Sequence, residues 1–310
     1  MPIEKAILIG GSAGSLDALV EIVRSLQPDL PAAVFIVIHG PPRQKTYLPQ
    51  VLAPRTQWQI VLAEDQALIE SGHIYVAVPD RHLLLAQDHI HLSRGPKEGL
   101  HRPSINATFR TASMAYGERV IGVLLSGMLD DGAAGLWEIA NRGGITIVQD
   151  PKDAAYPSMP LNALTDAPID YRLPCHEIGP LLTNLVLGVV KPEKIHPPET
   201  ESGQVFSGFT CPECRGPLFE IRHKGPPEFR CRVGHLMSLR TLVDEETNTQ
   251  ERKLYEAIVA LQEGAELAEY AAKRIEGSDV EGFRREAEQL RKNAEAIRKM
   301  LEERATPSLK

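Results

Sequence analysis

Residues 4–23 read EKAILIGGSAGSLDALVEIV. An apolar run at residues 6–9 meets six small residues, Gly10 to Ser15, and apolar positions on one helical face follow. This order predicts a buried strand, a tight turn and a helix. The turn is compatible with two kinds of site: a glycine-rich loop that binds a phosphate, or a sharp bend that presents the Ser12 hydroxyl as a nucleophile.

The first 190 residues continue this alternation of apolar runs and helical patterns. AVFIVI (33–38) and VIGVLL (120–125) are apolar throughout, which is typical of strands buried on both faces in a parallel sheet. We therefore expect an α/β fold: a doubly wound, mainly parallel, Rossmann-like sheet with helices on both faces. Strands are expected at residues 6–9, 33–38, 59–62, 73–77, 120–125 and 145–148, helices at 15–25, 108–116, 133–141 and 180–189, and a hairpin at 82–93.

Three further segments follow this domain, which we place at residues 1–190. Residues 191–205 contain three prolines and several charges and are expected to be a linker. Residues 206–240 form a small unit with three of the four cysteines. Residues 241–305 carry apolar residues at steps of four and three, from Leu254 to Ile275 and from Phe283 to Leu301. This seam predicts a helical hairpin or a coiled coil with a partner.

The bulk composition narrows the class of protein. The 310 residues have a formal net charge of −7, which argues against a nucleic-acid binder with a basic face. No apolar run approaches the roughly 20 residues that span a bilayer, and the N-terminus lacks the pattern of a signal peptide. We therefore expect a cytoplasmic protein.

The phosphate-loop interpretation has little support in the residues around the turn. A dinucleotide site needs a third glycine where Ser15 stands, and an acidic residue at the end of the second strand, where His39 stands. The Gly-Lys-Ser/Thr ending of a Walker A loop is also missing. Nucleotide binding at residues 10–14 stays open as a minor alternative.

The nucleophile interpretation has more support, because residues 10–14 satisfy G-x-S-x-G between a strand and a helix. The N–H groups at the start of that helix suit a developing oxyanion. An alternative role for Ser12 is to cap the helix. His39 directly follows the second strand, and Asp130 and Asp131 follow VIGVLL, so a nucleophile, a base and an acid are expected at one edge of the sheet.

Several segments resemble, in order, the catalytic domain of CheB-type protein-glutamate methylesterases, the methylesterases of chemotaxis. They are LIGGSAGS, VIHGPP, EDQALIESGHIYVAVPDRHLLL, HRPSINATFRTAS, LLSGMLDDGAAGL, and IVQDP with YPSMP. The resemblance implies hydrolysis of glutamate γ-methyl esters on methylated chemoreceptors, with release of methanol, and in related enzymes deamidation of receptor glutamines. It implies Ser12 as nucleophile, His39 as base and Asp131 as orienting acid, without a cofactor for catalysis.

The same resemblance implies that the backbone N–H of Met128 contacts the oxyanion. Ala13, Gly127 and Arg102 are further candidates for oxyanion or substrate contacts. For Arg102, in the segment HRPSIN, two roles stay open: part of the substrate cleft, or a loop residue that hydrogen-bonds neighbouring strand ends. Familiar members of the family carry an N-terminal receiver domain, whereas this sequence begins at the strand before Ser12. We therefore expect another switch.

The late cysteines form the pattern C-x2-C-x16-C-x3-H with Cys211, Cys214, Cys231 and His235. Three thiolates and an imidazole suit a closed, structural zinc site, with His223 as an alternative ligand. Arginines and phenylalanines around these ligands keep a nucleic-acid role open, and a protein-docking module is the other interpretation. The whole chain has a non-catalytic alternative, a scaffold or zinc-dependent binding module. The helical tail is a candidate site for a regulatory protein.

Overall fold

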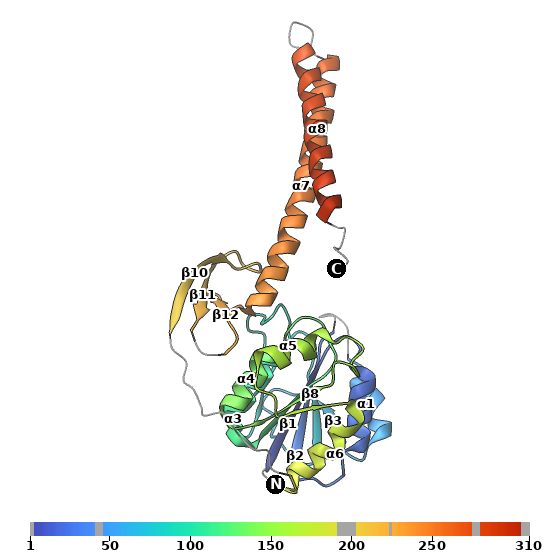
Figure 1. Ribbon diagram of the computed structural model, residues 1–310, viewed down its shortest axis with the longest axis vertical. Helices are drawn as coiled ribbons and strands as arrows, with labels where there is room; N and C mark the ends of the chain where they lie inside the picture. The colour runs from blue at the N-terminus through green and yellow to red at the C-terminus, as the bar shows by residue number, and fades with distance from the viewer. Residues whose placement is uncertain (1–2, 41–45, 191–202, 223–224, 275–279, 305–310) are drawn as a thin grey trace. The chain divides into compact units, whose positions relative to one another are not determined.

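The computed structural model describes residues 3–40, 46–190, 203–222, 225–274 and 280–304 (Figure 1). The chain divides into two compact units, residues 1–242 and 243–310. Residues 191–202 of the expected linker, together with His223 and Ile275, lie outside the described residues. None of the helices in the described ranges combines the length and the apolar character that a bilayer crossing requires.

A seven-stranded sheet forms the centre of the first unit, in the order β3-β4-β2-β1-β7-β8-β9. All its neighbouring strands pair in parallel, which confirms the expected fold class. The strands are β1 (Lys5–Gly11), β2 (Ala32–Ile38), β3 (Gln59–Leu62), β4 (His73–Val76), β7 (Val120–Leu124), β8 (Ile145–Gln149) and β9 (Tyr171–Leu173). The expected hairpin is β5 (His82–Leu85) with β6 (Ile90–Ser93).

Helices cover both faces of the sheet (Figure 1). Phe109, Leu136 and Met159 bring α3, α4 and α5 into the core on one face. Leu19 and Leu182 bring α1 and α6 into the core on the other face. The helices of this domain are α1 (Leu16–Ser25), α2 (Leu48–Leu52), α3 (Ile105–Tyr116), α4 (Ala133–Asn141), α5 (Ser158–Asp166) and α6 (Cys175–Val186).

The expected helices and strands differ from the observed ones mainly at short or proline-containing segments. The sequence patterns did not predict α2, α5 or β9, which have five, nine and three residues. Helix α6 begins at Cys175, directly after Pro174, rather than at Pro180 as expected. Pro180 lies inside the helix, where it removes one main-chain hydrogen bond without ending the helix.

The rest of the described chain forms a small sheet and two long helices. Antiparallel strands follow the order β10 (Gln204–Thr210), β11 (Pro217–Ile221), β12 (Glu228–Cys231) and β13 (Leu236–Ser238). Helices α7 (Leu239–Arg274) and α8 (Val280–Arg304) follow. In the second unit Ile258 packs with Ala294 and Leu301, and Ala268 packs with Ala287. The helices therefore form an antiparallel hairpin along the expected seam.

Helix α6 approaches α1 closely at Gly179. A Cβ at this position would overlap the Ser25 side chain and lie 2.9 Å from the Ile22 carbonyl oxygen. We expect Gly179→Ala to lower the free energy of unfolding of the first unit by about 2 kcal/mol, because overpacking outweighs the better helix propensity of alanine. Urea unfolding followed by tryptophan fluorescence measures this unit, since Trp58 and Trp137 both belong to it.

Gly282→Ala in α8 is the matched control, because a Cβ there meets no atom within 4 Å. It should leave the fluorescence transition unchanged. A Gly179→Ala protein as stable as the wild type would contradict the close approach of the two helices.

Candidate active site

Ser12 lies directly beyond the end of β1, at the carboxyl edge of the sheet. Its N–H donates to the Ser126 carbonyl at 2.9 Å, which ties the turn to the end of β7. A Cβ at Gly127 would lie 2.9 Å from the Ser12 Cβ, so the two residues pack closely. Helix α1 has Ser15, not Ser12, in its N-cap position. The half-buried hydroxyl of Ser12 is therefore not used as the cap of this helix.

His39 leaves the neighbouring strand beside Ser12. Parallel pairing places Gly11 opposite Ile38, and the His39 N–H donates to the Gly11 carbonyl at 3.1 Å. The residues that follow this pair, Ser12 and His39, therefore emerge side by side from adjacent strands. The His39 side chain is buried, with 7% of it exposed.

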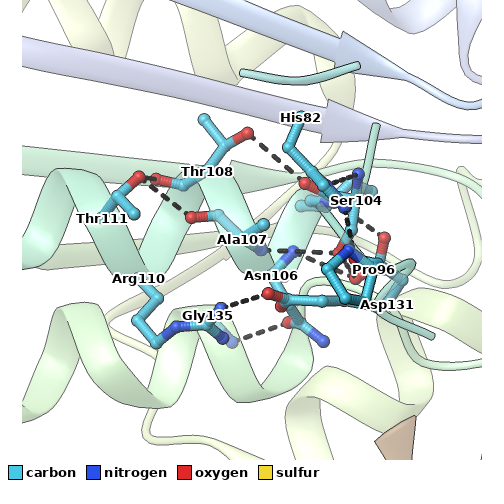
Figure 2. Close-up of polar contacts among 12 residues, drawn as sticks. His82, Pro96, Ser104, Asn106, Ala107, Thr108, Arg110, Thr111, Asp131 and Gly135 are labelled. Carbon is cyan, nitrogen blue, oxygen red and sulfur yellow. Dashed lines mark hydrogen bonds and ion pairs between the residues drawn. The ribbon is translucent and has the colours of Figure 1, made fainter. Parts of the chain in front are cut away.

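The Asp131 carboxylate lies at the beginning of helix α3, as Figure 2 shows. The N–H groups of Ile105 and Asn106 donate to it at 2.7 and 3.0 Å, and the Ser104 hydroxyl donates at 2.9 Å. Its Oδ2 also lies 2.8 Å from Nε2 of His39. The unpaired N–H groups and partial positive charge of a helix N-terminus stabilise such a negative charge.

These contacts keep Asp131 ionised. Burial disfavours the charged form of Asp131, but the hydrogen bond from His39, the neighbouring histidine rings and the Asn106 amide outweigh it and lower the pKa of Asp131 to about 2. The carboxylate is therefore ionised and accepts the Nε2 proton of His39. In the neutral ring Nδ1 is then the proton acceptor. Nδ1 is buried and has no hydrogen-bond partner among the described residues.

His101 covers the His39 ring. The two rings stack with their centroids 3.7 Å apart and their planes at 13°. Burial, followed by repulsion from the His39 charge, lowers the pKa of His101 to about 4. A neutral His101 shields the His39–Asp131 pair from water at pH 7 without adding a positive charge.

The candidate oxyanion contacts differ in whether their N–H groups are available. The Gly127 N–H donates to the Tyr156 carbonyl at 3.0 Å, so Gly127 supplies space beside Ser12 rather than a donor. Within the described residues, the N–H groups of Ala13 and Met128 have no main-chain acceptor. Met128 is also exposed, with 58% of the residue accessible.

Arg102 is bound to residues of neighbouring loops. Its Nε and Nη2 donate to Asp80 Oδ1 at 3.0 and 2.6 Å, and its Nη1 donates to the carbonyls of Arg94 and Gly95. The guanidinium therefore ties a loop to neighbouring residues. The pKa of Asp80 is lowered by this ion pair.

Two residues that the sequence patterns did not single out connect the loops of the site. The Ser126 hydroxyl donates to the Ala13 carbonyl at 2.8 Å and accepts from the Tyr156 N–H at 2.9 Å. The side-chain oxygen of Asn106 accepts from the N–H groups of Gly132 and Gly135. Ser126 directly follows the apolar run 120–125 in the sequence. This position indicates that Ser126 lies at the carboxyl edge of the sheet.

A second cluster lies in the small sheet. The ligand atoms of Cys211, Cys214, Cys231 and His235 all lie within 4.8 Å of one another. His235 Nδ1 is 3.7 Å from Cys211 Sγ and 3.5 Å from Cys231 Sγ, and the sulfurs of Cys214 and Cys231 are 3.6 Å apart. A tetrahedral zinc with ordinary bond lengths separates such ligands by about 3.5–3.8 Å. The donor set and its spacing therefore fit one zinc ion.

The lowered pKa of His101 predicts a pH dependence of stability. In the unfolded chain His101 has a pKa of about 6.5 and binds a proton below that pH. In the folded chain its pKa is about 4, so it binds this proton only near pH 4. Stability is therefore lost as the pH falls from 6.5 to 4, by up to about 3 kcal/mol at this residue. His101→Gln should lose less stability than the wild type over this range, measured by urea unfolding at pH 7 and pH 4. Equal losses in both proteins would contradict this interpretation.

Comparisons with known proteins identify the family of the α/β domain. The family model described as CheB methylesterase matches residues 7–182. A protein of Leptospira interrogans named putative protein-glutamate methylesterase/protein-glutamine glutaminase is 37% identical over 182 residues, 58% of this chain and 94% of that protein. A protein of Methanosarcina mazei named protein-glutamate methylesterase/protein-glutamine glutaminase 2 is 32% identical over 192 residues, which are 52% of its own length.

A solved structure is similar as well. The CheB methylesterase catalytic domain of Thermotoga maritima aligns with a TM-score of 0.57 and 29% identity, over 58% of this chain and 98% of that domain. The matched region includes Ser12, His39 and Asp131 and ends before the small sheet and the helical hairpin. The family model covers more than half of the residues, and the chain is therefore a member of the CheB methylesterase family.

Proposed function

We propose that this chain hydrolyses glutamate γ-methyl esters of methylated chemoreceptors through Ser12, His39 and Asp131. The observation that carries the proposal is the unpartnered, buried Nδ1 of His39. The other ring nitrogen is held by an ionised carboxylate, and Ser12 leaves the adjacent strand. The Ser12 hydroxyl makes no hydrogen bond with Nδ1 in this structure. The proposal therefore requires that the hydroxyl comes within hydrogen-bond reach of Nδ1 when the ester binds, as activation of a serine demands. The names of the relatives give the substrate class.

In the first half-reaction Ser12 Oγ attacks the ester carbonyl carbon while its proton passes to Nδ1 of His39. Asp131 stabilises the imidazolium through the hydrogen bond at Nε2. We assign the oxyanion to the N–H groups of Ala13 and Met128, which have no main-chain acceptor among the described residues. The tetrahedral intermediate collapses when the C–O bond to the methoxy group breaks, and the Nδ1 proton leaves with it as methanol.

In the second half-reaction a water molecule attacks the acyl-enzyme and gives its proton to Nδ1. Breaking the bond to Ser12 Oγ returns that proton to the serine and releases glutamate. The same steps hydrolyse a glutamine side chain when ammonia is the leaving group. Relatives are named for both activities, so glutamine deamidation is the second candidate reaction.

Loss of the Ser12 hydroxyl tests the nucleophile. Ser12→Ala should lower the rate of methanol release from methylated receptor membranes by at least about 1,000-fold, because the covalent step is lost. Ser113→Ala is the matched control: this hydroxyl donates to the Arg110 carbonyl within α3 and should leave the rate within twofold. Equal rates for Ser12→Ala and the wild type would favour the alternative of a non-catalytic scaffold.

We also propose that the Cys3His cluster holds a structural zinc ion. Four protein ligands leave no position for water or substrate, so the ion closes the fold of the small sheet rather than taking part in hydrolysis. The apolar core of this sheet is small, consisting of Cys211, Leu218, Phe229, Cys231, Met237 and Leu242. Metal binding would therefore supply much of its stability. The helical hairpin is a candidate docking site for a regulatory protein, and the cytoplasm is the expected compartment.

Metal analysis tests this assignment. Inductively coupled plasma mass spectrometry of the purified wild type should find one zinc per chain. Cys214→Ser should contain less than a tenth of this amount. Cys175→Ser is the matched control, because this thiol lies at the start of α6 outside the cluster, and it should keep the full zinc content. A metal-free wild type that binds no added zinc would overturn the assignment.

A further inference from the structure

The small sheet and the α/β domain belong to the same compact unit, and main-chain hydrogen bonds join them. The Gly99 N–H donates to the Leu236 carbonyl at 2.8 Å, and the Leu236 N–H donates to the Lys97 carbonyl at 3.4 Å. Leu236 thus pairs with residues 97–99 as a strand would. It also directly follows His235, one of the four candidate zinc ligands.

The loop that Leu236 holds leads into the active site. Glu98 and His101 exchange hydrogen bonds between their main chains, and His101 stacks on His39. Gly99 and Leu100 both have left-handed backbone angles, with φ of 54° and 69°. A Cβ at Gly99 would lie 3.9 Å from the Asp131 carboxylate, so this loop also borders Asp131. The loop is strained at Leu100, because a left-handed leucine is unfavourable without external support.

A second connection reaches the residue before the carboxylate. The Thr241 hydroxyl, in the first turn of α7, donates to Asp130 Oδ1 at 3.1 Å, and both residues are buried. Ser238 Oγ in turn accepts from the Thr241 N–H at 3.1 Å. Arg240 forms an ion pair with Asp166 at the end of α5. The segment that follows His235 is therefore attached to the domain at two places: at residues 97–99, and at Asp130 and Asp166.

The Cys3His cluster includes both ends of the turn that precedes Leu236, namely Cys231 and His235. The Cys231 N–H donates to the His235 carbonyl at 3.0 Å, and the Gly234 N–H donates to the Cys231 carbonyl at 3.0 Å. The turn between Cys231 and His235 thus places Leu236 beside residues 97–99. The turn also packs against the domain, since a Cβ at Gly234 would lie 3.1 Å from Pro96. An open cluster would release this turn and the contacts that depend on it.

We propose that the metal-bound Cys3His unit positions the catalytic pair: Leu236 and Thr241 hold the loop at residues 97–101 and Asp130, and thereby the His39–Asp131 contact. Leu236 and Thr241 are positioning residues, since neither contacts the reacting atoms. The part of this inference that concerns hydrolysis rests on the proposed function. The part that concerns the His39 and His101 rings is independent of it.

A series of threonine variants in the zinc-loaded 310-residue chain tests the second connection. Thr241→Val should lower kcat for methanol release about fivefold with KM unchanged, because Asp130 loses a buried hydrogen bond. Thr241→Ser keeps the hydroxyl and should restore kcat to within twofold of the wild type. Thr247→Val is the matched control on the same helix, since the exposed Thr247 hydroxyl only bonds the Val243 carbonyl.

Metal removal tests the first connection with readouts other than activity. In the chelated wild type and in Cys214→Ser, the Gly99 amide should exchange with deuterium at least about tenfold faster, because its acceptor on Leu236 is released. The ring carbon signals of ¹³C-labelled His39 and His101 should move, while zinc addition to the chelated protein should restore them. His39, Asp131 and Lys97 are the charged groups that act on His101, so the pH is held constant in both states.

The possible outcomes separate this inference from the proposed function. Metal-free protein with unchanged Gly99 exchange and unchanged ring signals would overturn the positioning role, and so would a Thr241→Val protein with wild-type kcat. If the wild type releases no methanol, the proposed function fails. The exchange rate and the ring signals then decide the positioning role alone. If Cys214→Ser unfolds as a whole, the chelated wild type and the threonine series decide it.

Discussion

The candidate active site depends on one carboxylate and the donors around it. Asp131 accepts hydrogen bonds from the first residues of helix α3 on one side and from His39 on the other. Because these donors outweigh the cost of burial, the carboxylate keeps its charge inside the protein. That charge favours the His39 tautomer with its proton on Nε2, which leaves Nδ1 free to serve as the proposed base. The N-terminus of α3 thus supplies three of the donors that hold this charge.

The sheet supplies the other half of the geometry. Parallel pairing of β1 with β2 and β7 brings three chain segments to one carboxyl edge, where open α/β sheets bind their ligands. Small residues at the end of β1 leave room for close packing, so Gly127 approaches Ser12 and Ser126 bonds the turn. The stacked His101 ring completes the cover over His39. The proposed reacting groups therefore come from the segments that follow three different strands, β1, β2 and β7.

The segment after the α/β domain extends this arrangement. Its three cysteines and one histidine lie close enough to share an ion, and its next strand pairs with the loop that leads to His101. A small sheet with few apolar core residues is thereby connected to the loop that leads to His101. The helical hairpin forms a separate unit with its own apolar seam of isoleucine, leucine and alanine.

Local patterns in the sequence were sufficient for the fold class, the main strands, the helical hairpin and the cluster of Cys211, Cys214, Cys231 and His235. Apolar periodicity and ligand spacing act between residues that are near in the chain. They missed β9 and α2, which are too short to show a period, and they placed the start of α6 at a proline that lies inside it.

The choice of Asp131 over Asp130 came from family resemblance. Only the tertiary structure decided that His39 meets Asp131 across 92 residues and that Ser15, not Ser12, occupies the N-cap position of α1. It also decided that Arg102 is bound to Asp80 and that Leu236 reaches residues 97–99. These contacts depend on how helices and strands pack in three dimensions, which no spacing along the chain records.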